Sequence, residues 1–259
     1  MIRKILLSSL LVFSACNNPS SPLIPATGSG RPSPTTPIPI KESTLGATLG
    51  INESVDLRAF DAPIVNQFGE SCTAFATAAA MDNLFKKKGI NKLVSERHLW
   101  STYSIGDLNA AIAAASSNYI TEEQYWPINS TPPINWQYMD HASLKITQVK
   151  NDQYDMNAAL QGLSQGHPIV MGIQVPSSLE NCDADIDPNS SATTGEHAIE
   201  AVGYRLDDSV SGGGYFILKN SWGNGCGDQG YHYYPFSLCT RSDLFCYFTE
   251  ILEAEDRAP

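Results

Sequence analysis

The sequence is 259 residues long, with 42% hydrophobic and 17% charged residues, and its formal net charge is -11. Such a chain forms one large domain or two modest ones, and its composition excludes disorder throughout. The acidic excess argues against nucleic acid as a partner, because neutralising phosphates requires clustered Lys and Arg. We attribute the negative charge to solubility.

The N-terminus has the order of a secretory signal peptide. Two basic residues precede an apolar run that ends at Phe13, and small residues follow as far as Cys16. The run is shorter than the roughly 20 apolar residues that span a bilayer. The last residues resemble a bacterial lipobox, in which the cysteine is lipidated, although Phe13 replaces the usual leucine. We therefore expect residues 1–16 to direct export, with lipidated Cys16 anchoring the chain to a membrane of the bacterial cell envelope. Plain cleavage and free secretion is the alternative.

Residues 17–50 are rich in Pro, Ser, Thr and Gly and show neither helical nor strand periodicity. We interpret them as a disordered, extended spacer, because proline keeps such segments stretched. The folded domain is then expected to occupy residues 51–259.

The next element is a predicted helix from Ser71 to Lys88, which begins after the loop that contains Gly69. Good helix formers fill it, apolar side chains recur at helical spacing, and Gly89 follows as a stop signal. Cys72 lies at the head of this helix, where free N–H groups favour a thiolate. The residues alone leave three readings open: a nucleophile, half of a disulfide, or a small buried side chain.

Two strands later in the chain supply candidate partners for Cys72. The segment EHAIEAVGYR alternates like a strand and has His197 near its start, while a second strand, Tyr215 to Leu218, leads to Asn220. A glycine-rich turn and a third strand from Tyr231 follow. If the first two strands pair, an imidazole and an amide become neighbours, which would provide a base and a group that orients it.

The other histidines receive structural assignments. His98 is placed in a surface helix, and His167 comes before a strand. No partner is evident for the remaining two, His141 and His232.

Five cysteines remain if Cys16 carries a lipid, so they cannot all pair with one another. Exported proteins usually form disulfides, and Cys72 is the natural choice for a free thiol because the others lie in turn-rich stretches. These four allow three pairings, among which the sequence does not choose. Our working expectation is Cys239 with Cys246, closing a short loop, and Cys182 with Cys226. No CxxC or paired His/Cys spacing suggests a metal site.

Three blocks of the sequence, NQFGESCTAFA, EHAIEAVGY and YFILKNSWGNGCGDQGY, resemble the active-site blocks of the papain-like cysteine peptidases, in the family's chain order. The similarity extends over about residues 51–252. It implies an α+β fold with a mainly helical lobe, an antiparallel barrel lobe and a cleft between them.

The resemblance also implies roles for individual residues. Cys72 would be the nucleophile, His197 its partner, and Asn220 the residue that holds His197, with Trp222 shielding that hydrogen bond. Gln67 would donate to the oxyanion. The implied protein is a monomer that cleaves peptides or proteins without a metal or organic cofactor.

Several departures from the family pattern bear on this reading. Gln67 lies only five positions before Cys72, one fewer than usual, and Asn66 occupies the usual offset. Thr73 replaces the customary Trp. The family commonly has a pair of glycines lining its substrate cleft. Here Gly106 occupies the second position of the pair, and Ile105 replaces the first glycine. Residues 17–50 are also too short and Pro-rich to form the family's helical prosegment.

These departures keep a second function in view: a papain-fold lipoprotein that binds partners but hydrolyses poorly. Cysteine peptidases that cleave peptidoglycan fit less well, because they use a different third residue and lack the NSWG motif.

Overall fold

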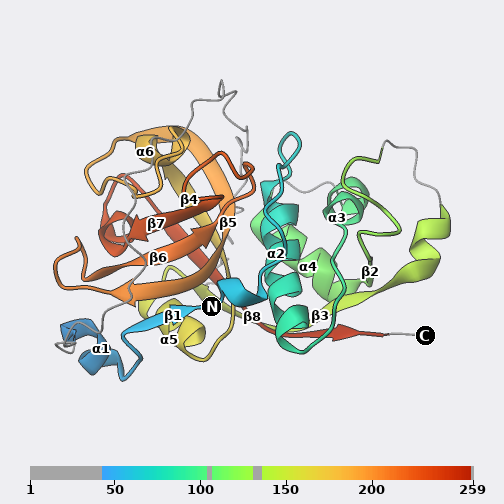
Figure 1. The fold of residues 1–259 in the computed structure, drawn as a ribbon, viewed down its shortest axis with the longest axis horizontal. Helices are drawn as coiled ribbons and strands as arrows, with labels where there is room; N and C mark the ends of the chain where they lie inside the picture. Colours follow the sequence, from blue (N-terminus) through green and yellow to red (C-terminus); the bar gives the residue numbers. More distant parts are fainter. Residues whose placement is uncertain (1–42, 104–106, 131–135, 258–259) are drawn as a thin grey trace, which may run out of the picture.

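The computed structural model describes residues 43–103, 107–130 and 136–257 (Figure 1). Its helices are α1 (Thr44–Leu49), α2 (Cys72–Lys87), α3 (Glu96–Tyr103), α4 (Leu108–Ser117), α5 (Met156–Ser164) and α6 (Ser177–Glu180), with short 3-10 helices η1 (Arg58–Phe60), η2 (Trp136–His141) and η3 (Phe236–Thr240). Its strands are β1 (Ser54–Asp56), β2 (Ile120–Thr121), β3 (Ala142–Gln153), β4 (Ile169–Pro176), β5 (Ala192–Leu206), β6 (Gly214–Lys219), β7 (Tyr231–Pro235) and β8 (Cys246–Asp256).

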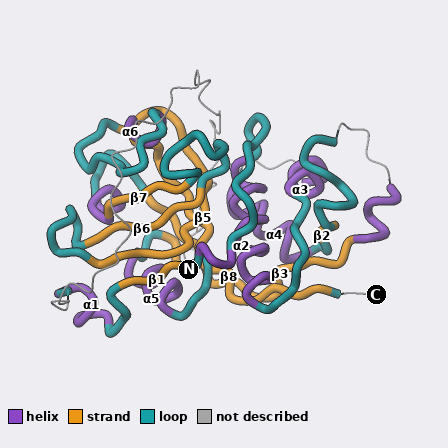
Figure 2. Tube along the Cα trace, in the orientation of Figure 1, coloured by secondary structure: helices purple, strands orange, loops and turns teal. Residues whose placement is uncertain are grey.

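The strands form one antiparallel sheet in the order β2-β3-β8-β4-β5-β6-β7, and β1 pairs with β5. Figure 2 shows that most strands gather in one lobe, while α2, α3 and α4 form the other. The far ends of β3 and β8 run beneath the helical lobe and contribute apolar side chains to its core. The expected α+β fold with a helical lobe and an antiparallel lobe is confirmed.

Helix α2 is the central element of the helical lobe. It runs from Cys72 to Lys87, flanked by Ser71 and Lys88, so the predicted bounds are confirmed. Nearly all of its residues are buried, and its many alanines let α3, α4 and β5 approach closely. In the part of the chain that the structure describes, no helix is long and apolar enough to cross a membrane.

The start of the described chain departs from the expected spacer. Residues 44–49, placed within the spacer, form α1, with Ser43 capping its first turn and Gly50 ending it in a left-handed conformation. Leu45 and Leu49 pack against the core of the sheet lobe. These two side chains lie one helical turn apart, which explains why a segment with so few apolar residues still folds.

The expected strands and disulfides are present. In β5 and β6, Glu200 pairs with Lys219, which brings the end of β6 alongside the middle of β5. Cys182 bonds to Cys226, and Cys239 bonds to Cys246. Both expected pairings are therefore confirmed.

We predict that Gly203→Ala destabilises the protein by about 1–3 kcal/mol through overpacking. Gly203 lies on β5 between β1 and β6, and a Cβ there would be 2.2 Å from the Val55 carbonyl oxygen. Urea denaturation checks the change in the free energy of unfolding. Gly225→Ala is the control, because nothing lies within 4 Å of a Cβ at that position. Equal stability of the two variants would contradict the prediction.

Candidate active site

Cys72 lies where the helical lobe meets the sheet. Its Sγ accepts a hydrogen bond from the Ala198 backbone N–H at 3.4 Å. Ala198 follows His197 on β5, so the sulfur at the head of α2 lies beside the predicted histidine. Both Cys72 and His197 are completely buried.

The expectation that Cys72 is a free thiol is wrong for the state that this structure depicts. The Cys72 sulfur belongs to a disulfide, and none of the described cysteines is a free thiol. A thiol at a helix N-terminus ionises readily, and the thiolate is the form that enters disulfide exchange. Any nucleophilic role for Cys72 therefore requires reduction first.

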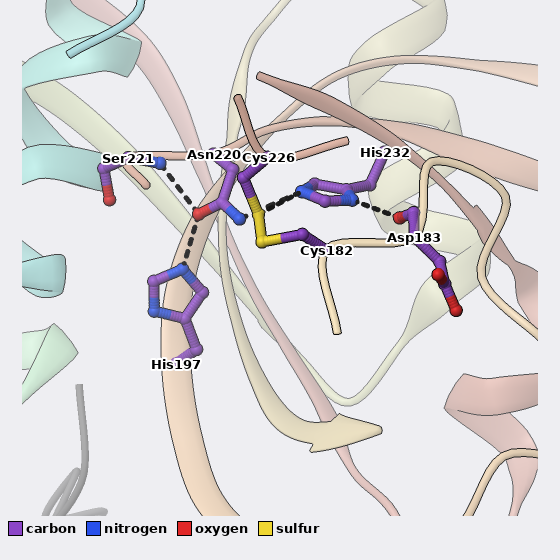
Figure 3. Close-up of a disulfide and its surroundings, with 7 residues drawn as sticks. All are labelled: Cys182, Asp183, His197, Asn220, Ser221, Cys226 and His232. Atoms are coloured by element: carbon purple, nitrogen blue, oxygen red, sulfur yellow. Dashed lines mark hydrogen bonds between the residues drawn. A yellow bond between two sulfur atoms is a disulfide. The ribbon is translucent and has the colours of Figure 1, made fainter. Parts of the chain in front are cut away.

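Asn220 holds the His197 ring, as Figure 3 shows. The two side chains meet at 2.9 Å, between Nε2 of His197 and Oδ1 of Asn220, and the Ser221 backbone N–H donates to the same oxygen at 2.8 Å. An amide oxygen only accepts, so Nε2 of His197 carries a proton. The opposite ring nitrogen, Nδ1, is buried and makes no hydrogen bond within the described part of the chain. Nδ1 is therefore the ring nitrogen that can still exchange a proton with a reacting group.

Burial controls the charge of His197. It lowers the pKa of the imidazole to about 4, and the hydrogen bond to Asn220 offsets part of this effect. In the disulfide-bonded state the ring is consequently neutral at pH 7. A thiolate beside it would favour the imidazolium, because an opposite charge nearby stabilises the charged form.

Trp222 lies against the histidine. The two ring centroids are 4.6 Å apart with a 33° angle between the planes, and the indole is only 8% exposed. The indole therefore keeps water from one side of the imidazole, consistent with the shielding role that the sequence suggested for it.

Gln67 is bound to the segment that follows Asn220. Its backbone N–H donates to the Ser221 carbonyl at 2.7 Å, and its side-chain oxygen accepts from the Ser221 hydroxyl at 2.7 Å. Its amide nitrogen donates to the Gly69 carbonyl at 3.2 Å. Asn66, the alternative, forms an isolated backbone bridge with Trp222. Gln67 thus lies on the loop that leads to Cys72, with its amide donor turned toward that loop.

The structure corrects two histidine assignments. His98 is completely buried rather than on a surface helix, and its Nδ1 accepts from the Thr121 backbone N–H at 3.0 Å. His232, for which no partner was evident, is completely buried on β7 and contacts Asn220 at 3.0 Å. Its place between two tyrosines in an alternating strand was the available signal, since alternate residues of a strand face the same side. His141 stacks on Tyr125, and His167 contacts Glu250.

A buried acidic group lies below the site and was not foreseen. Asp82 and Glu96 line a small pocket together with Lys219, which precedes Asn220. Burial raises the pKa of Asp82 to about 8 and that of Glu96 well above its ordinary range. Asp82 is thus largely protonated at neutral pH. No cluster of three or more potential metal ligands occurs in the described residues.

Two further candidates cannot be placed. Cys16, the expected lipidation site, and Gly106, the expected cleft residue, lie outside the described residues.

A cysteine at a helix head, next to a strand whose histidine is held by an amide, is the arrangement of cysteine-dependent hydrolases. Residues 51–241 match the profile described as "Papain family cysteine protease". The chain therefore belongs to the papain family of cysteine proteases.

The chain is also similar in sequence to individual known proteins. Papaya proteinase 4 from Carica papaya is 31% identical over 193 residues, 69% of this chain and 54% of the relative. Chymopapain from the same plant is 27% identical over 197 residues, 69% of this chain and 53% of the relative. The chain thus spans about half the length of these curated relatives.

Solved structures share the fold. Xylellain, a cysteine protease from Xylella fastidiosa, superposes with a TM-score of 0.64 at 22% identity, covering 79% of this chain and 88% of xylellain. Bromelain from Ananas comosus, solved in complex with the E64 inhibitor, gives a TM-score of 0.63 at 22% identity, covering 78% of this chain and 100% of bromelain.

We predict that Asp82→Asn stabilises the protein increasingly as the pH rises from about 4 to 8. The pKa of Asp82 is near 3.8 when unfolded and about 8 when folded, so the unfolded state releases its proton first and wild-type stability falls over this interval. Asparagine stays neutral and keeps an acceptor for the Val94 N–H, which lies 2.8 Å from the carboxyl. Urea denaturation at several pH values measures the difference.

The exposed Asp243, whose pKa its partner Arg241 lowers, provides the control. Asp243→Asn is expected to show no comparable trend. A stability difference for Asp82→Asn that stays constant from pH 5 to 8 would contradict the raised pKa.

Proposed function

We propose that this chain is an exported cysteine endopeptidase in which Cys72, His197 and Asn220 cleave peptide bonds through a thioester. The observation that carries the proposal is the state of the His197 ring. Asn220 binds Nε2 of the ring, and Nδ1 makes no hydrogen bond among the described residues. The next residue, Ala198, contacts the Cys72 sulfur through its backbone N–H.

The chemistry follows from these positions. Once reduced, Cys72 forms a thiolate, favoured by the helix head and by the imidazolium of His197. The thiolate attacks the peptide carbonyl, and His197 passes its Nδ1 proton to the departing amine. Water then attacks the thioester, with neutral His197 taking a proton from it, and the carboxylic acid and the Cys72 thiolate are released.

Gln67 would stabilise the oxyanion together with the Cys72 backbone N–H. Its amide nitrogen donates to the Gly69 carbonyl at 3.2 Å, on the loop that leads to Cys72, so the donor lies on the segment where the oxyanion would form. Losing one such donor typically costs roughly 10² to 10³ in turnover. Trp222 would protect the His197–Asn220 hydrogen bond from water while the reaction proceeds.

The two disulfides and the family membership indicate a protein of the secretory pathway or cell exterior. Within that setting we propose a monomer, lipidated at Cys16 and attached to a bacterial membrane, with free secretion as the alternative. Peptides or proteins are its substrates. The spacer would end at about residue 42, since Ser43 already caps α1.

A second function, binding without efficient hydrolysis, is supported by one observation. In the structure the nucleophile is held in a disulfide, and both Cys72 and His197 are completely buried. A domain that keeps this state would use the papain fold only as a scaffold.

Alkylation after reduction separates the two functions. We expect an epoxide inhibitor of papain-type thiolates to modify Cys72 in the folded, reduced full chain, with a rate at least about 10²-fold lower in His197→Ala. Peptide mapping by mass spectrometry identifies the modified cysteine, and cleavage of fluorogenic peptides should disappear in Cys72→Ala.

The oxidised protein is the matched control and should neither react nor cleave. Folded, reduced protein whose Cys72 stays unmodified would reject the peptidase and favour the binding protein.

A further inference from the structure

His232 is the strongest unassigned feature of the site. It lies on β7, opposite Leu218 of β6, and its ring is completely buried beside the Asn220 side chain (Figure 3). The proposed peptide hydrolysis uses only Cys72, His197 and Asn220 directly. The second buried imidazole, that of His232, therefore needs its own explanation.

The hydrogen bonds fix which nitrogen of His232 carries the proton. Nδ1 lies 2.7 Å from the Asp183 carbonyl oxygen, which only accepts, so Nδ1 must donate. In the neutral ring Nε2 is then an acceptor, and it lies 3.0 Å from Nδ2 of Asn220. The Asn220 amide donates to His232 through its nitrogen and therefore presents its oxygen to His197.

The chain of donors runs in one direction from His197 to Asn220 to His232 to the Asp183 carbonyl. Reversing the Asn220 amide would set its oxygen against the acceptor nitrogen of His232 and its nitrogen against the donating Ser221 N–H. His232 and the Ser221 N–H thus hold the amide in the same orientation from two sides.

A disulfide supports the far end of this chain. Asp183 directly follows Cys182, which is bonded to Cys226, and the Cys226 sulfur lies 3.9 Å from Nε2 of His232. The Gly227 N–H donates to the Cys182 carbonyl at 3.0 Å. A Cβ at Gly227 would lie 2.7 Å from the His232 ring, so the ring is enclosed on this side.

We infer that His232 is a positioning residue for peptide hydrolysis: it links the disulfide-bound loop at Asp183 to Asn220 and so fixes the direction in which Asn220 presents its oxygen to His197. This inference rests on the proposed function. Burial lowers the pKa of His232 to about 4, so the ring keeps its neutral, accepting form throughout the neutral pH range.

Substitutions separate hydrogen bonding from packing. His232→Leu fills a similar space but cannot accept from Asn220, whereas the side-chain oxygen of His232→Gln can. In the reduced protein we expect His232→Leu to lower kcat about tenfold with KM within about twofold, and His232→Gln to stay within about threefold of wild type. His98→Leu is the control, because His98 is equally buried and its pKa is also lowered to about 4, but it lies in the helical lobe. It should leave kcat per active site unchanged.

The pH dependence of Cys72 alkylation by iodoacetamide provides a readout that needs no peptidase activity. The ionisable groups beside His197 are Cys72 from α2 and His232 from β7. When Asn220 is poorly held, the His197 imidazolium is less stable and loses its proton at a lower pH. The Cys72 thiolate and the His197 imidazolium coexist over a limited pH range. We expect the upper end of that range to fall by about half to one pH unit in His232→Leu, and not in His232→Gln.

Three results would overturn the inference: wild-type kcat and pH dependence in folded His232→Leu, equal defects in His232→Leu and His232→Gln, or equal defects in His232→Leu and His98→Leu.

If His232→Leu does not fold, nitrogen-15 NMR of histidine-labelled wild-type protein decides. A neutral His232 protonated at Nδ1 at pH 7 supports the inference, and an Nε2-protonated or charged ring rejects it. Epoxide labelling of wild-type Cys72 tests the proposed function separately.

Discussion

The candidate site depends on one amide whose two ends are not interchangeable. Asn220 must offer its oxygen to His197 and its nitrogen to His232, and the contacts at both ends agree. This agreement requires three adjacent strands in a fixed register, since His197 is on β5, Asn220 directly follows β6 and His232 is on β7. Because a shift of one residue along a strand turns every side chain to the opposite face, the register of the sheet is a condition for the site.

Burial makes the site sensitive to which charges are present. The rings of His197 and His232 both have a pKa lowered to about 4. Beneath them, burial raises the pKa of Glu200, whose nearest cation is Lys219 at 3.9 Å. The two imidazoles that contact the amide are therefore neutral at pH 7 while Cys72 is oxidised. Reduction would introduce a thiolate into buried surroundings, where its attraction to an imidazolium is stronger than in water.

The sequence predicts the parts of this structure that depend on local patterns. Helical spacing located α2, strand alternation located β5, and the contexts of Cys72, His197 and Asn220 indicated the family. The missed features depend on distant neighbours. Only its place in an alternating strand hints at His232, because its partners are distant in sequence: the amide after β6 and the carbonyl of Asp183. His98 reads as a polar helix residue, yet Trp126 stacks on its ring at 5.1 Å and buries it. Helix α1 has too few apolar residues to stand out from its Pro-rich surroundings.

The short loop before Cys72 shows how the fold accommodates a missing residue. Gln67 is fixed by backbone and side-chain hydrogen bonds to Ser221, on the segment that also bears Asn220. Gly69 adopts a left-handed conformation, with φ of 51°, and the Ser71 hydroxyl donates to the Phe68 carbonyl at 2.6 Å. The loop is thereby tightened between two fixed ends, Ser221 and the start of α2. A shorter connection therefore changes the path between Gln67 and Cys72 while both ends keep their attachments. Gln67, the proposed oxyanion donor, stays bound to the segment that bears Asn220.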